Sequence, residues 1–150
     1  SQYGRTFPAS LYDTRQAVPG DYADGWAGWL GADSLLLTVS LREPTAISRI
    51  ALGTCACPND WVVAPLTVEV SIDGGPWTPL MPSTFAADRN SVLSNPNAVP
   101  DCSRLRFGLD THPQRASNLR LRIKPQPRLP QGHPFEGEKA WLMLDEIEIQ

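Results

Sequence analysis

Prolines and glycines recur along this chain and limit what it can fold into. Fifteen prolines and eleven glycines are distributed over 150 residues, and they interrupt helices while favouring turns. Between them, apolar and polar residues alternate with a period of two, as in Leu66 to Ile72 and Leu119 to Lys124. Successive side chains of a strand point to opposite faces, so this alternation is typical of strands with one buried face. The sequence therefore predicts many short strands joined by turns.

About seven or eight such strands predict an all-β fold, an antiparallel β-sandwich. The run Leu35–Val39 is apolar on both faces, which indicates a strand in the middle of a sheet that is covered twice. The segments 81–100 and 125–137 alternate weakly and are interpreted as long loops. A chain of 150 residues fits one hydrophobic core, so we expect a single domain over 1–150 with its core at roughly 20–149.

The charge balance gives no reason to expect nucleic acid as a partner. Thirteen Lys and Arg against sixteen Asp and Glu give a net charge of −3, whereas a phosphate-binding surface needs a clustered cationic excess. Five cations nevertheless fall on the predicted outward faces of two strands, namely Arg104, Arg106, Arg120, Arg122 and Lys124. We favour a solvated sheet face paired with neighbouring glutamates over an anion-binding stripe. No apolar run of about 18 residues is present, so we expect no membrane insertion.

Motifs of the common catalytic sites are absent from the sequence. It contains no Gly-x-Ser-x-Gly, no His-Glu-x-x-His and no glycine-rich phosphate loop. Cys55-Ala-Cys57 lacks the spacing and the second ligand pair of a zinc site. The odd number of cysteines leaves two alternatives open, a bridge from Cys55 or Cys57 to Cys102 or buried free thiols. We therefore expect a chain without catalytic activity of its own.

The five tryptophans are the most informative candidates for binding. A rigid indole stacks on the apolar face of a sugar ring, while neighbouring polar groups bind the hydroxyls. Trp61 follows Asn59 and Asp60 in a connection between predicted strands and has that neighbourhood. Tryptophans of a sandwich also fill its core, and we assign Trp77 and Trp141 to the core because they stand at strand positions.

Three blocks of the sequence resemble a known family. They read DGWAGWLGAD at 24–33, ISRIALG at 47–53 followed by NDW at 59–61, and HP–G–KAWL–LDEI within 133–147. In this order they resemble the C-terminal domain of bacterial family 20 glycoside hydrolases, the chitobiases and β-hexosaminidases. The resemblance implies a galactose-binding-like jelly roll, of the group that includes discoidin and coagulation-factor C-type domains, with ligand loops at one end.

The resemblance also implies a setting and a metal. It places the chain in a secreted, periplasmic or cell-surface bacterial enzyme, whose catalytic domain is a partner. We expect the module itself to be a monomer. Many members of the group hold a structural calcium between the first loop and the last strand, and the matching ligands here are Asp24 and Glu146. Hard carboxylate oxygens suit Ca²⁺.

Two functions follow from the resemblance. The first is binding of a glycan of the galactose or N-acetylhexosamine type. Its candidate residues are Trp26, Trp29 and Trp61 for stacking, and Asp33, Asp60, His133 and Lys139 for hydroxyl contacts. The second is a purely structural domain that packs on the catalytic domain, in which the same polar residues hold loops and the tryptophans pack. The fold group favours the first function.

Overall fold

The computed structural model describes residues 11–12, 17–18, 22, 25–84 and 102–150. The elements in this part of the chain are seven strands, and no helix suited to crossing a membrane occurs in it. The strands are β1 (Ala27–Leu30), β2 (Leu35–Ala56), β3 (Thr67–Ile72), β4 (Thr78–Pro79), β5 (Met81–Thr84), β6 (Ser103–Lys124) and β7 (Trp141–Ile149). All their pairings are antiparallel, which confirms the predicted all-β class.

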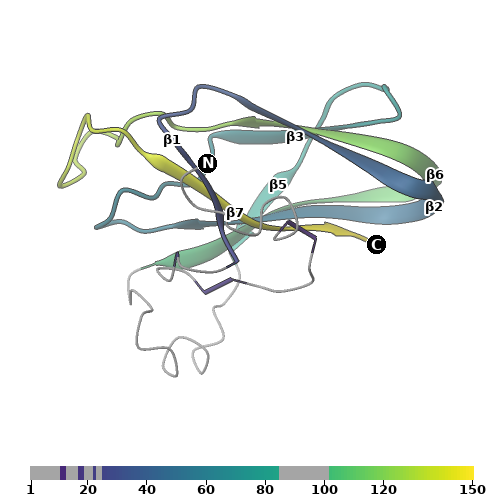
Figure 1. Ribbon diagram of the computed structural model, residues 1–150, viewed down its shortest axis with the longest axis horizontal. Coiled ribbons are helices and arrows are strands. Elements are labelled where there is room, and N and C mark those ends of the chain that lie inside the picture. Colours follow the sequence, from purple (N-terminus) through teal and green to yellow (C-terminus); the bar gives the residue numbers. More distant parts are fainter. Residues whose placement is uncertain (1–10, 13–16, 19–21, 23–24, 85–101) are drawn as a thin grey trace.

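Two long strands, β2 and β6, contribute to both layers of a sandwich. They pair along nearly their whole length, and Figure 1 shows them turning back together at one end of the molecule. Layer 1 contains the first part of β2, the second part of β6, β3 and β4. Layer 2 contains the second part of β2, the first part of β6, β5, β7 and β1. The predicted antiparallel β-sandwich is thus built from one continuous hydrogen-bonded sheet.

The bend coincides with proline in both strands. The register of β2 on β6 shifts between Ser40 and Thr45 and again between Ile47 and Arg49. Pro44 lies in the first irregular stretch, and Pro113 lies on β6 opposite the second. Proline has no N–H to donate to a ladder and is tolerated at bulges. The prolines therefore interrupt the pairing at the bend. The sequence analysis predicted separate short strands here, whereas the structure has two long strands that bend.

The main core lies between the two layers. Alternate residues of the layer 1 strands point into it, and side chains of layer 2 meet them from the other side. Fully buried examples are Val68, Val70, Leu119, Leu121 and Ile123 from layer 1, and Ile50, Leu52 and Leu144 from layer 2. Burial of each such side chain contributes at most about 1.5–3 kcal/mol.

Among the described strands, the first part of β2 is an edge, which corrects one prediction. The apolar run Leu35–Val39 was expected to be covered on both faces, yet Leu36 is 58% exposed. Leu35, Leu37 and Val39 pack against the core from its margin. The reason is that β7 pairs with β2 only from Ile50 onward, so among the described strands only β6 pairs with this part of β2.

Layer 2 is covered on its outer face as well. A second apolar cluster there contains Ala17, Trp26, Cys55, Cys57, Val62, Cys102 and Met143. The Trp26 indole donates a hydrogen bond to the Val18 carbonyl at 3.0 Å, which joins the segment before β1 to this face. Cys57 and Cys102 form a disulfide, and Cys55 is a buried free thiol. The chain thus combines both alternatives that the cysteine count left open.

A buried ion pair lies beside this cluster, at a bulge in β7. Leu52 pairs with Ile147 but Thr54 pairs with Leu144, so Asp145 and Glu146 both face Gly53. Arg104 donates from Nε at 2.9 Å, with Nη2 at 2.8 Å, to Oδ2 of Asp145. The Ala17 amide donates to the same oxygen at 3.1 Å. Burial raises the pKa of Asp145, while Arg104 acts in the opposite direction.

Gly53 leaves the space that this ion pair occupies. A Cβ built on Gly53 would overlap Oδ1 of Asp145 and lie 2.8 Å from Nη2 of Arg104. Gly108 is a matched position on β6, because a Cβ built there has no neighbour nearer than 3.9 Å. Any larger residue at position 53 would therefore clash with the side chain of Asp145, whereas position 108 has room for a Cβ.

We predict different effects of alanine at these two glycines. Gly53→Ala should lower the free energy of unfolding by about 1–3 kcal/mol, because the bulge must shift and the buried ion pair must rearrange. Gly108→Ala should change it by at most about 1 kcal/mol, and in the stabilising direction. Urea unfolding followed by tryptophan fluorescence measures both. Equal losses in the two variants would contradict this account of the bulge.

Candidate functional site

Connections between strands gather at the end of the sandwich away from the bend. In Figure 1 the β2–β3 connection and the β6–β7 connection project at this end. The Trp141 amide donates to the Trp61 carbonyl at 2.7 Å, and Val62 and Trp141 form a parallel bridge. The turn after β1 joins them, since the Gly31 amide donates to the Ala140 carbonyl at 2.8 Å. Three segments distant in sequence thus form one surface.

Trp61 is the central side chain of this surface and is held from two sides. Its ring stacks on Phe135 with centroids 4.0 Å apart and planes 17° apart. Its indole N–H donates to Oε2 of Glu138 at 2.6 Å. Its backbone N–H donates to Oδ1 of Asp60 at 2.7 Å, which fixes the turn that presents it. The residue nevertheless stays 36% exposed.

A small pocket of about 280 Å³ opens beside Trp61. Its lining residues are Tyr22, Asp60, Trp61, Val62, Trp141 and Met143. The Tyr22 hydroxyl lies 2.9 Å from Sγ of Cys57 and donates to Oδ2 of Asp60 at 3.5 Å. The pocket therefore combines three aromatic rings with one carboxylate, and the Cys57–Cys102 disulfide lies next to its wall.

Two of the predicted binding residues line this pocket and two tryptophans do not. Asp60 and Trp61 are part of its lining. Trp26 is only 1% exposed within the second cluster, and Trp29 packs against the main core. Both lie at β1, which pairs with β7 and is drawn into the body of the sandwich. Their positions fit the packing role that the structural alternative gives them.

The remaining predicted residues surround the surface without lining the pocket. Asp33 is exposed in the turn after β1. The aliphatic chain of the exposed Lys139 lies against Gly31. His133 is half-buried, and its Nδ1 accepts a hydrogen bond from the Phe135 amide at 3.1 Å. His133 thus holds the loop that places Phe135 on Trp61.

Phe135 and Glu138 are site residues that the sequence reasoning missed. They bind the ring and the N–H of Trp61 from the β6–β7 connection. The only signal available was an aromatic and an acid inside a long polar loop, without any indication of which loop they would meet. Their contacts with Trp61 are a property of the tertiary fold.

The predicted calcium ligands are described only in part. Glu146 is buried at the bulge of β7, and Asp24 lies outside the described residues. Within the described ranges, no three His, Cys, Asp or Glu side chains gather in a way that could hold a metal ion. Calcium binding therefore stays a prediction.

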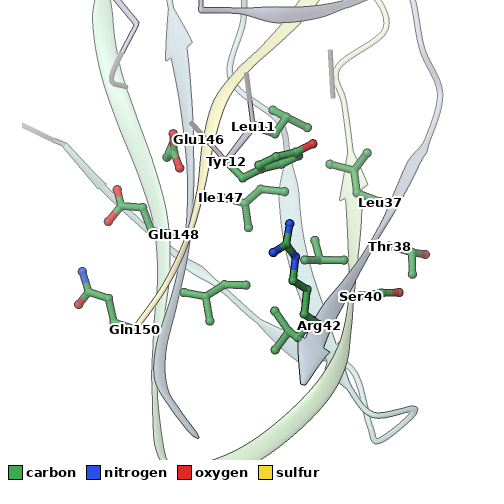
Figure 2. A pocket seen from close by; sticks show the side chains of 13 residues that line it. Leu11, Tyr12, Leu37, Thr38, Ser40, Arg42, Glu146, Ile147, Glu148 and Gln150 are labelled. Carbon is green, nitrogen blue, oxygen red and sulfur yellow. The ribbon is translucent and has the colours of Figure 1, made fainter. Parts of the chain in front are cut away.

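A larger cleft of about 950 Å³ lies between the first part of β2 and β7. Figure 2 shows Tyr12, Leu37, Arg42 and Ile147 lying together in it, whereas Glu148 points away on the other side of β7. Several of its lining side chains also pack the margin of the main core. We interpret this cleft as the edge at which the described parts of the two layers separate.

Comparison with known proteins finds a likeness in structure but none in sequence. No protein-family model and no curated protein matches the sequence. A Ruminococcus gnavus GH29 fucosidase, solved in complex with fucose, has a similar structure. The TM-score is 0.49 with 11% sequence identity, over 95% of this chain and 21% of the fucosidase chain. The chain thus spans about a fifth of the length of that enzyme.

The states of the three cysteines can be tested by titrating free thiols. Cys55 is buried, and burial raises the pKa of its thiol well above the ordinary value, with Asp145 adding to the effect. Little thiolate is therefore present, and the reagent has no access. We expect a thiol-titrating reagent to detect no thiol in the native chain and one in the chain denatured without reductant.

The control for this titration is Cys55→Ser, which should show no thiol even when denatured without reductant. Reduction before denaturation should reveal all three cysteines of the wild type. Detection of three thiols without reduction would show that Cys57 and Cys102 are not bridged.

Proposed function

We propose that this chain is a non-catalytic module that binds a single sugar unit at the Trp61 pocket. We place it in a larger secreted glycoside hydrolase of the chitobiase or β-hexosaminidase type, whose catalytic domain is its partner. The observation that carries the proposal is the exposed Trp61 ring, fixed by Phe135 and Glu138 beside the carboxylate of Asp60.

The fixed ring favours recognition of a sugar. An immobile indole loses little conformational entropy when a ligand stacks on it, and a carboxylate accepts hydrogen bonds from hydroxyls. The pocket volume of about 280 Å³ lies near the lower end for ligand sites, which are about 300–1,000 Å³. This size suits one galactose or N-acetylhexosamine unit. A site of this size buries little surface, so we expect weak, millimolar binding.

Two further features support the proposal. One concerns binding as opposed to catalysis, and the other concerns a location outside the cytoplasm. Glycoside hydrolases generally place two carboxyl groups around the bond that is cleaved, whereas Asp60 supplies the one carboxyl group among the described residues of the pocket lining. The Cys57–Cys102 disulfide supports a secreted or periplasmic location, because such bridges persist in oxidising compartments.

The structural alternative keeps one specific observation in its favour. Asp60 and His133 both accept hydrogen bonds from backbone amides of their own loops. Polar groups used in this way hold loops whether or not a sugar binds. A domain that only packs on the catalytic domain would show the same hydrogen bonds.

Titration with monosaccharides distinguishes the two functions. Galactose, N-acetylglucosamine and N-acetylgalactosamine are added to millimolar concentrations while NMR follows the indole N–H signals. We expect at least one sugar to shift the Trp61 signal, and Trp61→Ala to weaken binding about tenfold or more, because the stacking surface is lost. Trp77→Ala is the control, since Trp77 contacts Arg120 and Arg122 of layer 1 and should leave binding unchanged. No shift with any sugar would favour the structural domain.

A thermal melt tests the calcium proposal independently. If Asp24 and Glu146 share a calcium ion, a chelator should lower the melting midpoint, because removal of a ligand bound only to the folded state is destabilising. Glu146→Gln should remove this response to the chelator. An unchanged midpoint in the wild type would exclude a structural calcium.

A further inference from the structure

The five cations on the predicted outward faces fall on two separate faces of the molecule. They are divided because β6 passes from layer 2 into layer 1. Arg104 and Arg106 lie in layer 2, where they form ion pairs with acids of β7. Arg120, Arg122 and Lys124 lie in layer 1 and are exposed. Their neighbours in sequence are buried in the main core, so these three point outward from layer 1.

Trp77 holds two of these cations in place. The guanidinium carbon of Arg122 lies 4.4 Å from the centroid of the Trp77 ring, and that of Arg120 lies 5.3 Å from it. Arg122 also donates from Nε to Oε2 of Glu69 at 2.8 Å. Trp77 is half-buried on this outer face, which corrects its assignment to the core. Cation–π contacts of this kind restrict the guanidinium groups before any ligand arrives.

The charge on this face is not balanced within the described residues. Arg120 is flanked in the ladder by Thr38 and Ser71, and Lys124 pairs with Thr67. In the part of the chain that the structure describes, Glu69 is the one acid that forms an ion pair with any of the three cations. We call Glu69, Trp77, Arg120, Arg122 and Lys124 the Trp77 face.

Two exposed apolar side chains lie near the Trp77 face. Leu36, next to Arg122 in the ladder, is 58% exposed, and Leu66 at the end of the layer is 54% exposed. Side chains two residues apart on a strand are about 6.6 Å apart, so the three cations form a row of about 13 Å along β6. The outer face of layer 2, in contrast, is covered by the second cluster.

We propose that the Trp77 face binds a linear polysaccharide that carries sulfate or carboxylate groups. The planar fork of arginine binds such oxyanions through paired N–H donors, and Lys124 adds a third positive charge to the row. Because the ring of Trp77 is engaged by guanidinium groups, its role is to orient the arginines rather than to stack on sugar. This site is separate from the Trp61 pocket in position and in chemistry.

The test measures binding of the full 150-residue chain to polysaccharides at low ionic strength. The probes are a heparin-derived octasaccharide, a polygalacturonate oligomer, neutral dextran and a single-stranded oligonucleotide of matched charge. We expect at least one acidic polysaccharide to bind, dextran not to bind, and the affinity to fall between about 50 mM and about 200 mM salt. Binding of the oligonucleotide as tightly as the best polysaccharide would overturn the proposal, since the face would then recognise charge alone.

Matched variants locate the site. Arg120→Gln/Lys124→Gln should weaken binding of the acidic polysaccharide about tenfold or more, with an unchanged melting midpoint. Arg42→Gln/Arg115→Gln removes the same charge from exposed positions elsewhere and should retain binding. Equal losses in the two double variants, or wild-type affinity in the first, would overturn the proposal. Trp61→Ala should bind as the wild type does, so failure at the Trp61 pocket and failure here are distinguishable.

Discussion

The architecture depends on the antiparallel pairing of β2 with β6. This ladder extends from Leu35–Ile123 in layer 1 to Ala56–Ser103 in layer 2, so each layer contains part of both strands. The layers are therefore joined by hydrogen bonds and covalent chain as well as by their shared core. Pro44 lies near the bend and cannot donate to the ladder, which lets the strands turn at a defined level. The opposite end is left to loops, and the Trp61 pocket lies there.

The sequence predicts which side chains of a strand point into the core, because this depends only on whether a residue is at an odd or an even position along the strand. It does not predict which strands lie next to each other. The alternation at Leu119–Lys124 correctly placed leucines inside and cations outside, because parity is a local property. The run Leu35–Val39 looked like a central strand, but an edge and a centre differ only in the partners that the fold supplies. Trp77 was misplaced for the same reason, since its position beside two arginines follows from the pairing of β3 with β6.

The candidate site shows the same division. Asp60 and Trp61 could be found because a turn residue and an aromatic stand together in sequence. Glu138, which binds the Trp61 indole, is 77 residues away, and no local pattern connects it to Trp61. Trp26 and Trp29 are the same residue type as Trp61, yet both pack inside the sandwich because β1 pairs with β7. Tertiary pairing, rather than residue type, decides which tryptophan meets solvent.

The cations of β6 also have different roles on the two faces of the sandwich. In layer 2 the covering cluster excludes water, so Arg104 requires the carboxylate of Asp145, and Gly53 must leave room for both. In layer 1 the described residues form no such cover over Arg120, and its guanidinium is exposed beside Trp77. The two proposed sites differ in their ligands, a neutral sugar unit at the Trp61 pocket and an acidic polysaccharide at the Trp77 face, so each can be occupied without the other. The bent ladder of β2 and β6 separates them, because it places the Trp77 face on layer 1 and leaves the Trp61 pocket to the loops at the end of the sandwich.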